Sequence, residues 1–140
     1  MFTASCHCGD ICFQVPKKTL FAAICHCKSC RQVHSASFVP LIAYKLDSAK
    51  RLNNLLNELI NLNTSNKSTI YKKGTTEFVS CKTCSTTVYT KDKHLNYVTI
   101  PISILSVNKN MTTELKLPVP KFHMHYEEGL ISCFDSLTKY

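Results

Sequence analysis

Short apolar stretches recur between polar segments along most of the chain, a pattern typical of β-strands. β-Branched and aromatic residues dominate these stretches, and polar residues, proline or glycine bound them. The predicted strands are Ile11–Val15, Ser37–Tyr44, Glu77–Val79, Thr86–Lys91, Asn96–Ile100 and Phe122–Tyr126. Because short strands recur without a long helical pattern, the sequence predicts a mainly β domain.

One segment has a helical spacing instead. Its apolar residues are Leu52, Leu55, Leu56, Leu59 and Ile60, and this spacing predicts a short amphipathic helix over residues 52–62 that packs on the sheet. Asparagines fill the opposite face and the end of the segment. An asparagine-rich surface insertion is therefore the alternative.

The length of 140 residues predicts a single domain spanning residues 1–140. Apolar runs such as Ser37–Tyr44 are far shorter than the roughly 18–20 residues that span a bilayer. The first residues contain neither a basic stretch nor an apolar one, so we expect no export signal. These features predict a soluble, cytoplasmic protein with no membrane partner.

Cysteine is unusually abundant, with 9 residues against 3 glycines and no tryptophan. Clustered thiols in a reducing compartment are more often metal ligands than disulfides. The net charge is +8, and seven thiolates with two zinc ions would lower it by three units. The chain would stay mildly basic, which is compatible with an anionic small molecule or an acidic partner.

The outer cysteines form two pairs, Cys6 with Cys8 and Cys81 with Cys84. Each pair can turn two thiolates toward one ion, and two such turns complete a tetrahedral zinc site. Four thiolates leave no position for a substrate. We therefore expect this zinc to be structural, with its binding energy contributing to folding.

The middle cluster places Cys25, Cys27 and Cys30 within six residues. Three protein ligands leave zinc one open position, as in catalytic sites. Three thiolates also donate much charge to the ion, which favours a soft incoming ligand such as a thiol over water. The residues alone thus predict a catalytic zinc that captures a thiol substrate.

Other assignments are compatible with the same residues. One structural ion could use some of the seven cysteines, His7 or His26 could complete a shell, and disulfides are a third alternative. We expect Cys12 to be a core residue on a strand and Cys133 to serve in packing. No spacing points to a role for three further histidines, His34, His94 and His125.

Three cysteine elements in this order resemble the glutathione-dependent formaldehyde-activating enzyme and centromere protein V family. They are Ser5–Phe13, Cys25–Arg31 and Cys81–Cys84, and Ala36–Val39 resembles the strand after the middle element. Pro120–Met124 and Asp135–Tyr140 resemble the closing elements of that family. Ser85 stands where the family commonly has glycine after the last cysteine pair.

The resemblance implies a fold of packed antiparallel sheets called a β-tent, with two zinc ions. It implies a structural zinc on Cys6, Cys8, Cys81 and Cys84. It implies a second, catalytic zinc on Cys25, Cys27 and Cys30, with the thiol of glutathione as the fourth ligand. The activity it implies is that of a carbon–sulfur lyase that forms or cleaves S-hydroxymethylglutathione.

The resulting hypothesis is a zinc-dependent carbon–sulfur lyase acting on a glutathione-type adduct of formaldehyde or another aldehyde. Arg31 and Lys28 lie beside the middle cluster and could bind a substrate carboxylate. His123 could shuttle a proton or be structural. The alternative is a non-catalytic, zinc-stabilised module that binds an acidic partner. Because the lysines are scattered, nucleic acid is not the expected partner.

Overall fold

The computed structural model describes residues 1–46, 61–62, 65–106 and 117–140. Strands dominate these residues, which confirms the prediction of a mainly β fold. The helix predicted over 52–62 falls almost entirely on residues 47–60, which lie outside the described residues. No helix in the described part of the chain is long and apolar enough to cross a membrane.

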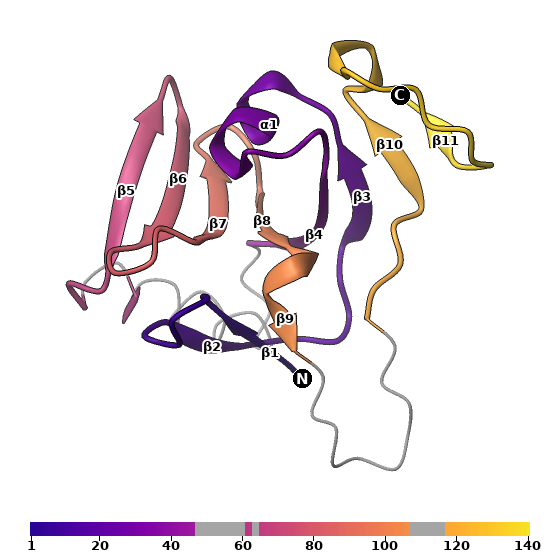
Figure 1. Cartoon of the computed structure of the whole chain (residues 1–140). Helices are drawn as coiled ribbons and strands as arrows, with labels where there is room; N and C mark the ends of the chain where they lie inside the picture. The colour runs from indigo at the N-terminus through magenta and orange to yellow at the C-terminus, as the bar shows by residue number, and fades with distance from the viewer. Residues whose placement is uncertain (47–60, 63–64, 107–116) are drawn as a thin grey trace.

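Most strands belong to one eight-stranded sheet, with the order β11-β10-β3-β4-β8-β7-β6-β5 (Figure 1). Neighbours from β3 to β5 pair antiparallel, whereas β10 runs parallel to both β3 and β11. The strands are β3 (Phe21–Cys25), β4 (Val39–Lys45), β5 (Ser68–Lys73), β6 (Thr76–Cys81), β7 (Thr87–Asp92), β8 (Tyr97–Pro101), β10 (Phe122–Met124) and β11 (Thr138–Lys139).

A second sheet of three strands packs against the first. It has the order β2-β1-β9 and comprises β1 (Phe2–Ser5), β2 (Cys12–Val15) and β9 (Leu105–Ser106). Phe2, Phe13 and Val15 of this sheet share one buried cluster with Ile42 and Ile100 of the large sheet. This shared core holds the β1–β2 turn close to the end of β6.

One short helix, α1 (Lys28–His34), follows β3 directly, and two 3-10 turns, η1 (Ile102–Ile104) and η2 (Tyr126–Glu128), complete the described elements. The sequence did not predict α1, because none of its seven residues is buried and so it has no apolar face. It begins instead with a thiol as its N-cap: the Cys27 sulfur accepts a hydrogen bond from the Cys30 N–H.

The six predicted strands all occur, with ends shifted by at most two residues. The predicted strand over Phe122–Tyr126 stops at Met124 because His125 adopts a left-handed conformation with φ of 54°. Other strands, among them β1, β3 and β5, were not predicted. β5 is an edge strand with almost every side chain exposed, and Ile70 and Tyr71 alone form too short an apolar stretch to indicate a strand.

Candidate metal centres and a buried histidine pair

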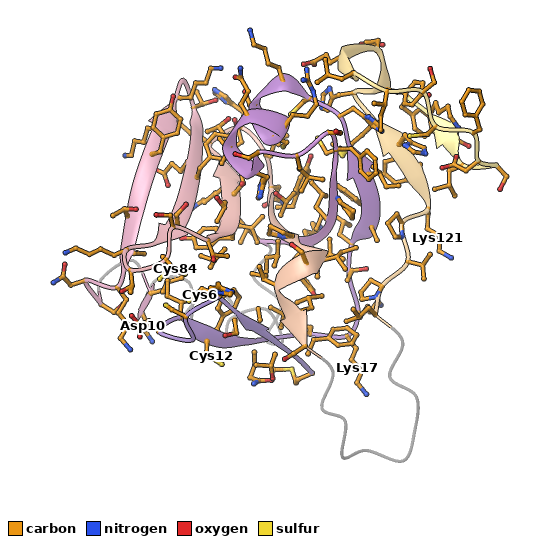
Figure 2. All side chains as sticks on the ribbon, in the orientation of Figure 1. Cys6, Asp10, Cys12, Lys17, Cys84 and Lys121 are labelled. Atoms are coloured by element: carbon orange, nitrogen blue, oxygen red, sulfur yellow. The ribbon has the colours of Figure 1, made fainter. Side chains whose placement is uncertain are left out.

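The four outer cysteines meet where the two sheets adjoin. Cys6 and Cys8 occupy the turn between β1 and β2, whereas Cys81 ends β6 and Cys84 lies in the turn between β6 and β7. Figure 2 shows Cys6 and Cys84 at this junction, and the sulfurs of all four cysteines lie within 4.8 Å of one another. The Thr83 hydroxyl donates to the Asp10 carboxylate at 2.7 Å and so ties the two turns together.

The spacing of these sulfurs fits a tetrahedral zinc ion. Zinc–sulfur bonds of about 2.3 Å in a tetrahedron place the sulfurs roughly 3.8 Å apart. The Cys6 and Cys8 sulfurs are 3.5 Å apart, and the Cys8 and Cys81 sulfurs are 3.7 Å apart. The Ile11 N–H also donates to the Cys6 sulfur, as expected for a thiolate ligand in a turn. We call Cys6, Cys8, Cys81 and Cys84 the closed cluster.

The three middle cysteines gather at the end of β3 and the first turn of α1. Their sulfurs also lie within 4.8 Å of one another. Cys25 is buried in the sheet, whereas Cys27 and Cys30 are partly exposed, so the group is reachable from solvent. We call Cys25, Cys27 and Cys30 the open cluster, because three sulfurs leave a fourth position to an ion held there.

The open cluster has one thiol that ionises readily. Hydrogen bonds from the Cys25 and Cys30 thiols, followed by the Cys30 N–H, lower the pKa of Cys27 to about 2. The pKa of Cys25 is raised to about 11, chiefly through its hydrogen bond with Cys27, and that of Cys30 is raised through its bonds with both neighbours. The negative charge of Cys27 is thus stabilised by the protons of the Cys25 and Cys30 thiols. A divalent cation bound to the three sulfurs would replace those protons.

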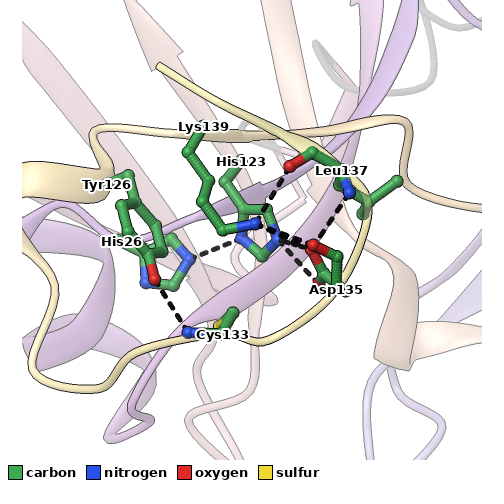
Figure 3. A network of polar contacts seen from close by, with 7 residues as sticks. All are labelled: His26, His123, Tyr126, Cys133, Asp135, Leu137 and Lys139. Carbon is green, nitrogen blue, oxygen red and sulfur yellow. Dashed lines mark hydrogen bonds and ion pairs between the residues drawn. The ribbon is translucent and has the colours of Figure 1, made fainter.

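His26, which lies between Cys25 and Cys27 in the chain, forms a buried pair with His123, and Figure 3 shows the two rings side by side. The side chains of His26 and His123 are both fully buried, and Nε2 of His26 lies 2.8 Å from Nδ1 of His123. The other ring nitrogen of His123, Nε2, is 2.9 Å from the Asp135 carboxylate. Lys139 in turn contacts Asp135 at 2.9 Å. A line of polar groups therefore connects the surface with the interior.

The segment after residue 121 also holds the loop of the open cluster through backbone groups. The His26 N–H donates to the Met124 carbonyl at 3.0 Å. Arg31 donates from Nε to the His26 carbonyl at 2.9 Å and from Nη2 to the Glu128 carbonyl at 2.8 Å. The Glu128 carboxylate accepts from the Lys28 N–H at 3.1 Å. These hydrogen bonds hold the loop of the open cluster against residues 124–128.

The family model described as glutathione-dependent formaldehyde-activating enzyme matches residues 1–119. The chain belongs to this family. A comparison with curated proteins gives no match. The part that matches the formaldehyde-activating family contains both cysteine clusters, whereas His123, Asp135 and Lys139 lie beyond it.

The structure therefore brings together each cysteine set predicted from the sequence of this formaldehyde-activating family member. The thiolate-rich donor sets fit zinc. Arg31, predicted to bind substrate, has two of its guanidinium nitrogens engaged with backbone carbonyls. Its role toward a ligand stays a prediction.

Two cysteines, Cys12 and Cys133, lie outside the clusters. The prediction of Cys12 as a core residue is wrong: the β2 alternation buries Phe13 and Val15 and leaves Cys12 exposed. Figure 2 shows its side chain directed away from the large sheet. The Cys133 sulfur lies within 4.8 Å of ring nitrogens of His26 and His123, a proximity for which the sequence offers no spacing signal.

Proposed function

We propose that the protein is a zinc-dependent carbon–sulfur lyase that forms or cleaves the S-hydroxymethyl adduct of glutathione or a similar thiol. The observation that carries the proposal is the open cluster, in which three sulfurs converge at a partly exposed position. Membership of the formaldehyde-activating family relates the chain to glutathione and formaldehyde. A thiol is also the ligand that a thiolate-rich zinc favours.

In this proposal Cys25, Cys27 and Cys30 hold the catalytic ion, and the closed cluster holds a structural one. Zinc at the open cluster would supply an electrophilic centre that keeps a substrate thiol deprotonated at neutral pH. The support for this assignment is the number of sulfurs in each cluster, because four complete a tetrahedral shell whereas three leave one position open.

The remaining contribution of the chain is positioning. A substrate sulfur fixed at the open cluster adds to the carbonyl carbon of the aldehyde, so one carbon–sulfur bond forms and the C=O double bond becomes a single bond. The proton lost by the thiol ends on the former carbonyl oxygen, and cleavage reverses each change. Holding the thiol and the aldehyde side by side converts a bimolecular reaction into an effectively unimolecular one. Lys28, exposed beside Cys27, supplies a cation for a substrate carboxylate.

The test is the rate of exchange between free and adducted formaldehyde in the presence of glutathione, measured by NMR with ¹³C-labelled formaldehyde. Zinc-loaded protein should accelerate the exchange, and Cys30→Ser should abolish the acceleration while the closed cluster keeps its zinc. Cys12→Ser is the matched control, because it removes an exposed thiol outside both clusters. No acceleration by the fully loaded protein would contradict the proposal and favour the binding module.

A further inference from the structure

His26 is the residue between two of the open-cluster cysteines, and nearly all of its polar atoms are engaged. Its N–H bonds to Met124, its carbonyl accepts from Arg31, and its Nε2 lies 2.8 Å from His123. Its ring also contacts the rings of Phe38 and Tyr126, with centroid separations of 5.7 and 5.0 Å. A residue fixed in this way fixes the backbone from which Cys25 and Cys27 extend.

Asp135 determines which of the two rings is the donor and which is the acceptor in the hydrogen bond between His26 and His123. Hydrogen bonds from Lys139 and then His123 lower the pKa of Asp135 to about 2, so its carboxylate is ionised and accepts hydrogen bonds. A neutral His123 therefore carries its proton on Nε2 and accepts on Nδ1. His26 then donates from Nε2 and keeps a lone pair on Nδ1. One ionised carboxylate thus selects the tautomers of both rings.

The free nitrogen of His26 agrees with this direction. Nδ1 is buried and has no hydrogen-bond partner among the described residues. An ideal Cβ atom at position 129 would lie 3.0 Å from this nitrogen and 2.9 Å from the Tyr126 carbonyl oxygen, so glycine permits the close packing. The ring is thus held by its single directed bond to His123 and by the shape of the surrounding residues.

We propose that Asp135 and His123 are positioning residues for the open cluster: through the ring of His26 they hold Cys25 and Cys27 in the arrangement that binds a metal ion. This inference rests on the part of the proposed function that assigns zinc to Cys25, Cys27 and Cys30. It extends the site into residues 122–140, which lie beyond the family match. This positioning role requires no change in the charge of His26 or His123.

A metal ion between the histidines is the competing explanation, because His26, His123 and Cys133 could themselves hold one. The observed separation argues for a shared proton. Two nitrogens bound to one zinc at about 2.0–2.1 Å in tetrahedral geometry are roughly 3.3 Å apart, whereas a hydrogen bond brings them to about 2.9 Å. The separation of 2.8 Å is the hydrogen-bond value, and His123 has its second nitrogen on Asp135.

The experiment compares the zinc affinities of the two clusters in wild type, Asp135→Asn and His123→Gln. Protein loaded with zinc is titrated with a chromogenic chelator, and Cys30→Ser identifies the ion that belongs to the open cluster. The same proteins loaded with cobalt report the coordination of each cluster by absorption. Asp135→Asn is the milder change because this carboxylate is 40% exposed. Asp92→Asn is its control, since Asp92 is also a hydrogen-bonded carboxylate, partly exposed, but lies at the far end of β7.

Asp135→Asn should weaken zinc binding at the open cluster about 10-fold and alter its cobalt spectrum, with the closed cluster and the Asp92→Asn protein unchanged. His123→Gln should act in the same direction. Equal weakening at both clusters, or no change at either, would overturn the positioning role while leaving the proposed function intact. A third zinc that disappears in Cys133→Ser would overturn it in favour of a metal between the rings. An open cluster that binds no zinc in wild type would overturn this inference and the proposed function together.

Discussion

His26 and His123 are 97 positions apart in the chain, yet their ring nitrogens lie 2.8 Å apart in an interior where both side chains are fully buried. The parallel pairing of β10 with β3 creates this contact, because it places Met124 opposite Cys25 and His123 opposite Ile24. A buried polar contact is costly unless its groups are paired, so the two histidines restrict how β10 can dock. The cysteine loop and the last strands therefore form one unit.

Loss of the closed cluster should affect folding. Cys81 is buried at the end of β6 and its N–H donates to the Thr86 carbonyl, so it anchors the whole turn. Cys81→Ser should lose the structural ion and unfold at lower temperature, because the binding energy of such an ion contributes to folding. Circular dichroism and zinc analysis measure both effects, with Cys12→Ser as the control. A Cys81→Ser protein with wild-type melting temperature and two zinc ions would contradict the structural assignment.

Ser85 should be replaceable by glycine with a gain in stability. Its φ of 62° lies in the left-handed region, which costs an L-residue energy and costs glycine almost none. Ser85→Gly should raise the free energy of unfolding by up to about 1 kcal/mol, after the greater freedom of glycine in the unfolded chain is subtracted. Urea unfolding of the zinc-loaded protein measures the change. Lower stability of the glycine variant would show that the strain is absent.

Gly129→Ala should be destabilising although its backbone is in an ordinary extended conformation. The added methyl group would lie 2.9 Å from the Tyr126 carbonyl oxygen and 3.0 Å from Nδ1 of His26, and both groups are held by their surroundings. Overpacking of this kind costs about 1–3 kcal/mol. Gly74→Ala is the comparison, since φ there is 60° with open space around it, so it measures backbone strain alone. Only the variant at position 129 should also disturb zinc binding at the open cluster.

Alkylation should distinguish the cysteines by their environment. In the zinc-loaded protein we expect iodoacetamide to modify Cys12 first, because it is exposed and outside both clusters. The cluster cysteines should be protected, because a metal-bound thiolate is less accessible to the reagent. A chelator should then remove zinc from the open cluster before the closed one, so that the cysteines of the open cluster are alkylated first. Mass spectrometry of peptides after timed alkylation gives the order, and early modification of Cys6 or Cys8 would argue against a bound ion there.

The cysteine groupings were predictable because each depends on short spacings that a single turn can satisfy. The pairing of Cys8 with Cys81, 73 positions away, followed from the chemistry of zinc, which needs two such turns. The strands were predictable where buried apolar residues dominate them, as in Val39–Lys45. In these places local sequence and tertiary structure agree.

The rest could not be read from the sequence for specific reasons. α1 buries no residue and is capped by a thiol, so it shows neither helical periodicity nor a usual cap. The histidine pair depends on a parallel strand contact that no local spacing reports. Cys12 was misassigned because the alternation in β2 places it on the outer face, opposite Phe13.

Because β10 pairs with β3 from the end of the chain, some contacts of the open cluster can form only late in synthesis. The amino-terminal part is made first, so Cys6, Cys8, Cys81 and Cys84 can meet before residues 122–140 exist. His26 must wait for its partners until those residues have been made. A product truncated after residue 119 would retain all seven cluster cysteines and the entire family match, but the loop that carries Cys25 and Cys27 would lack His123 and Asp135.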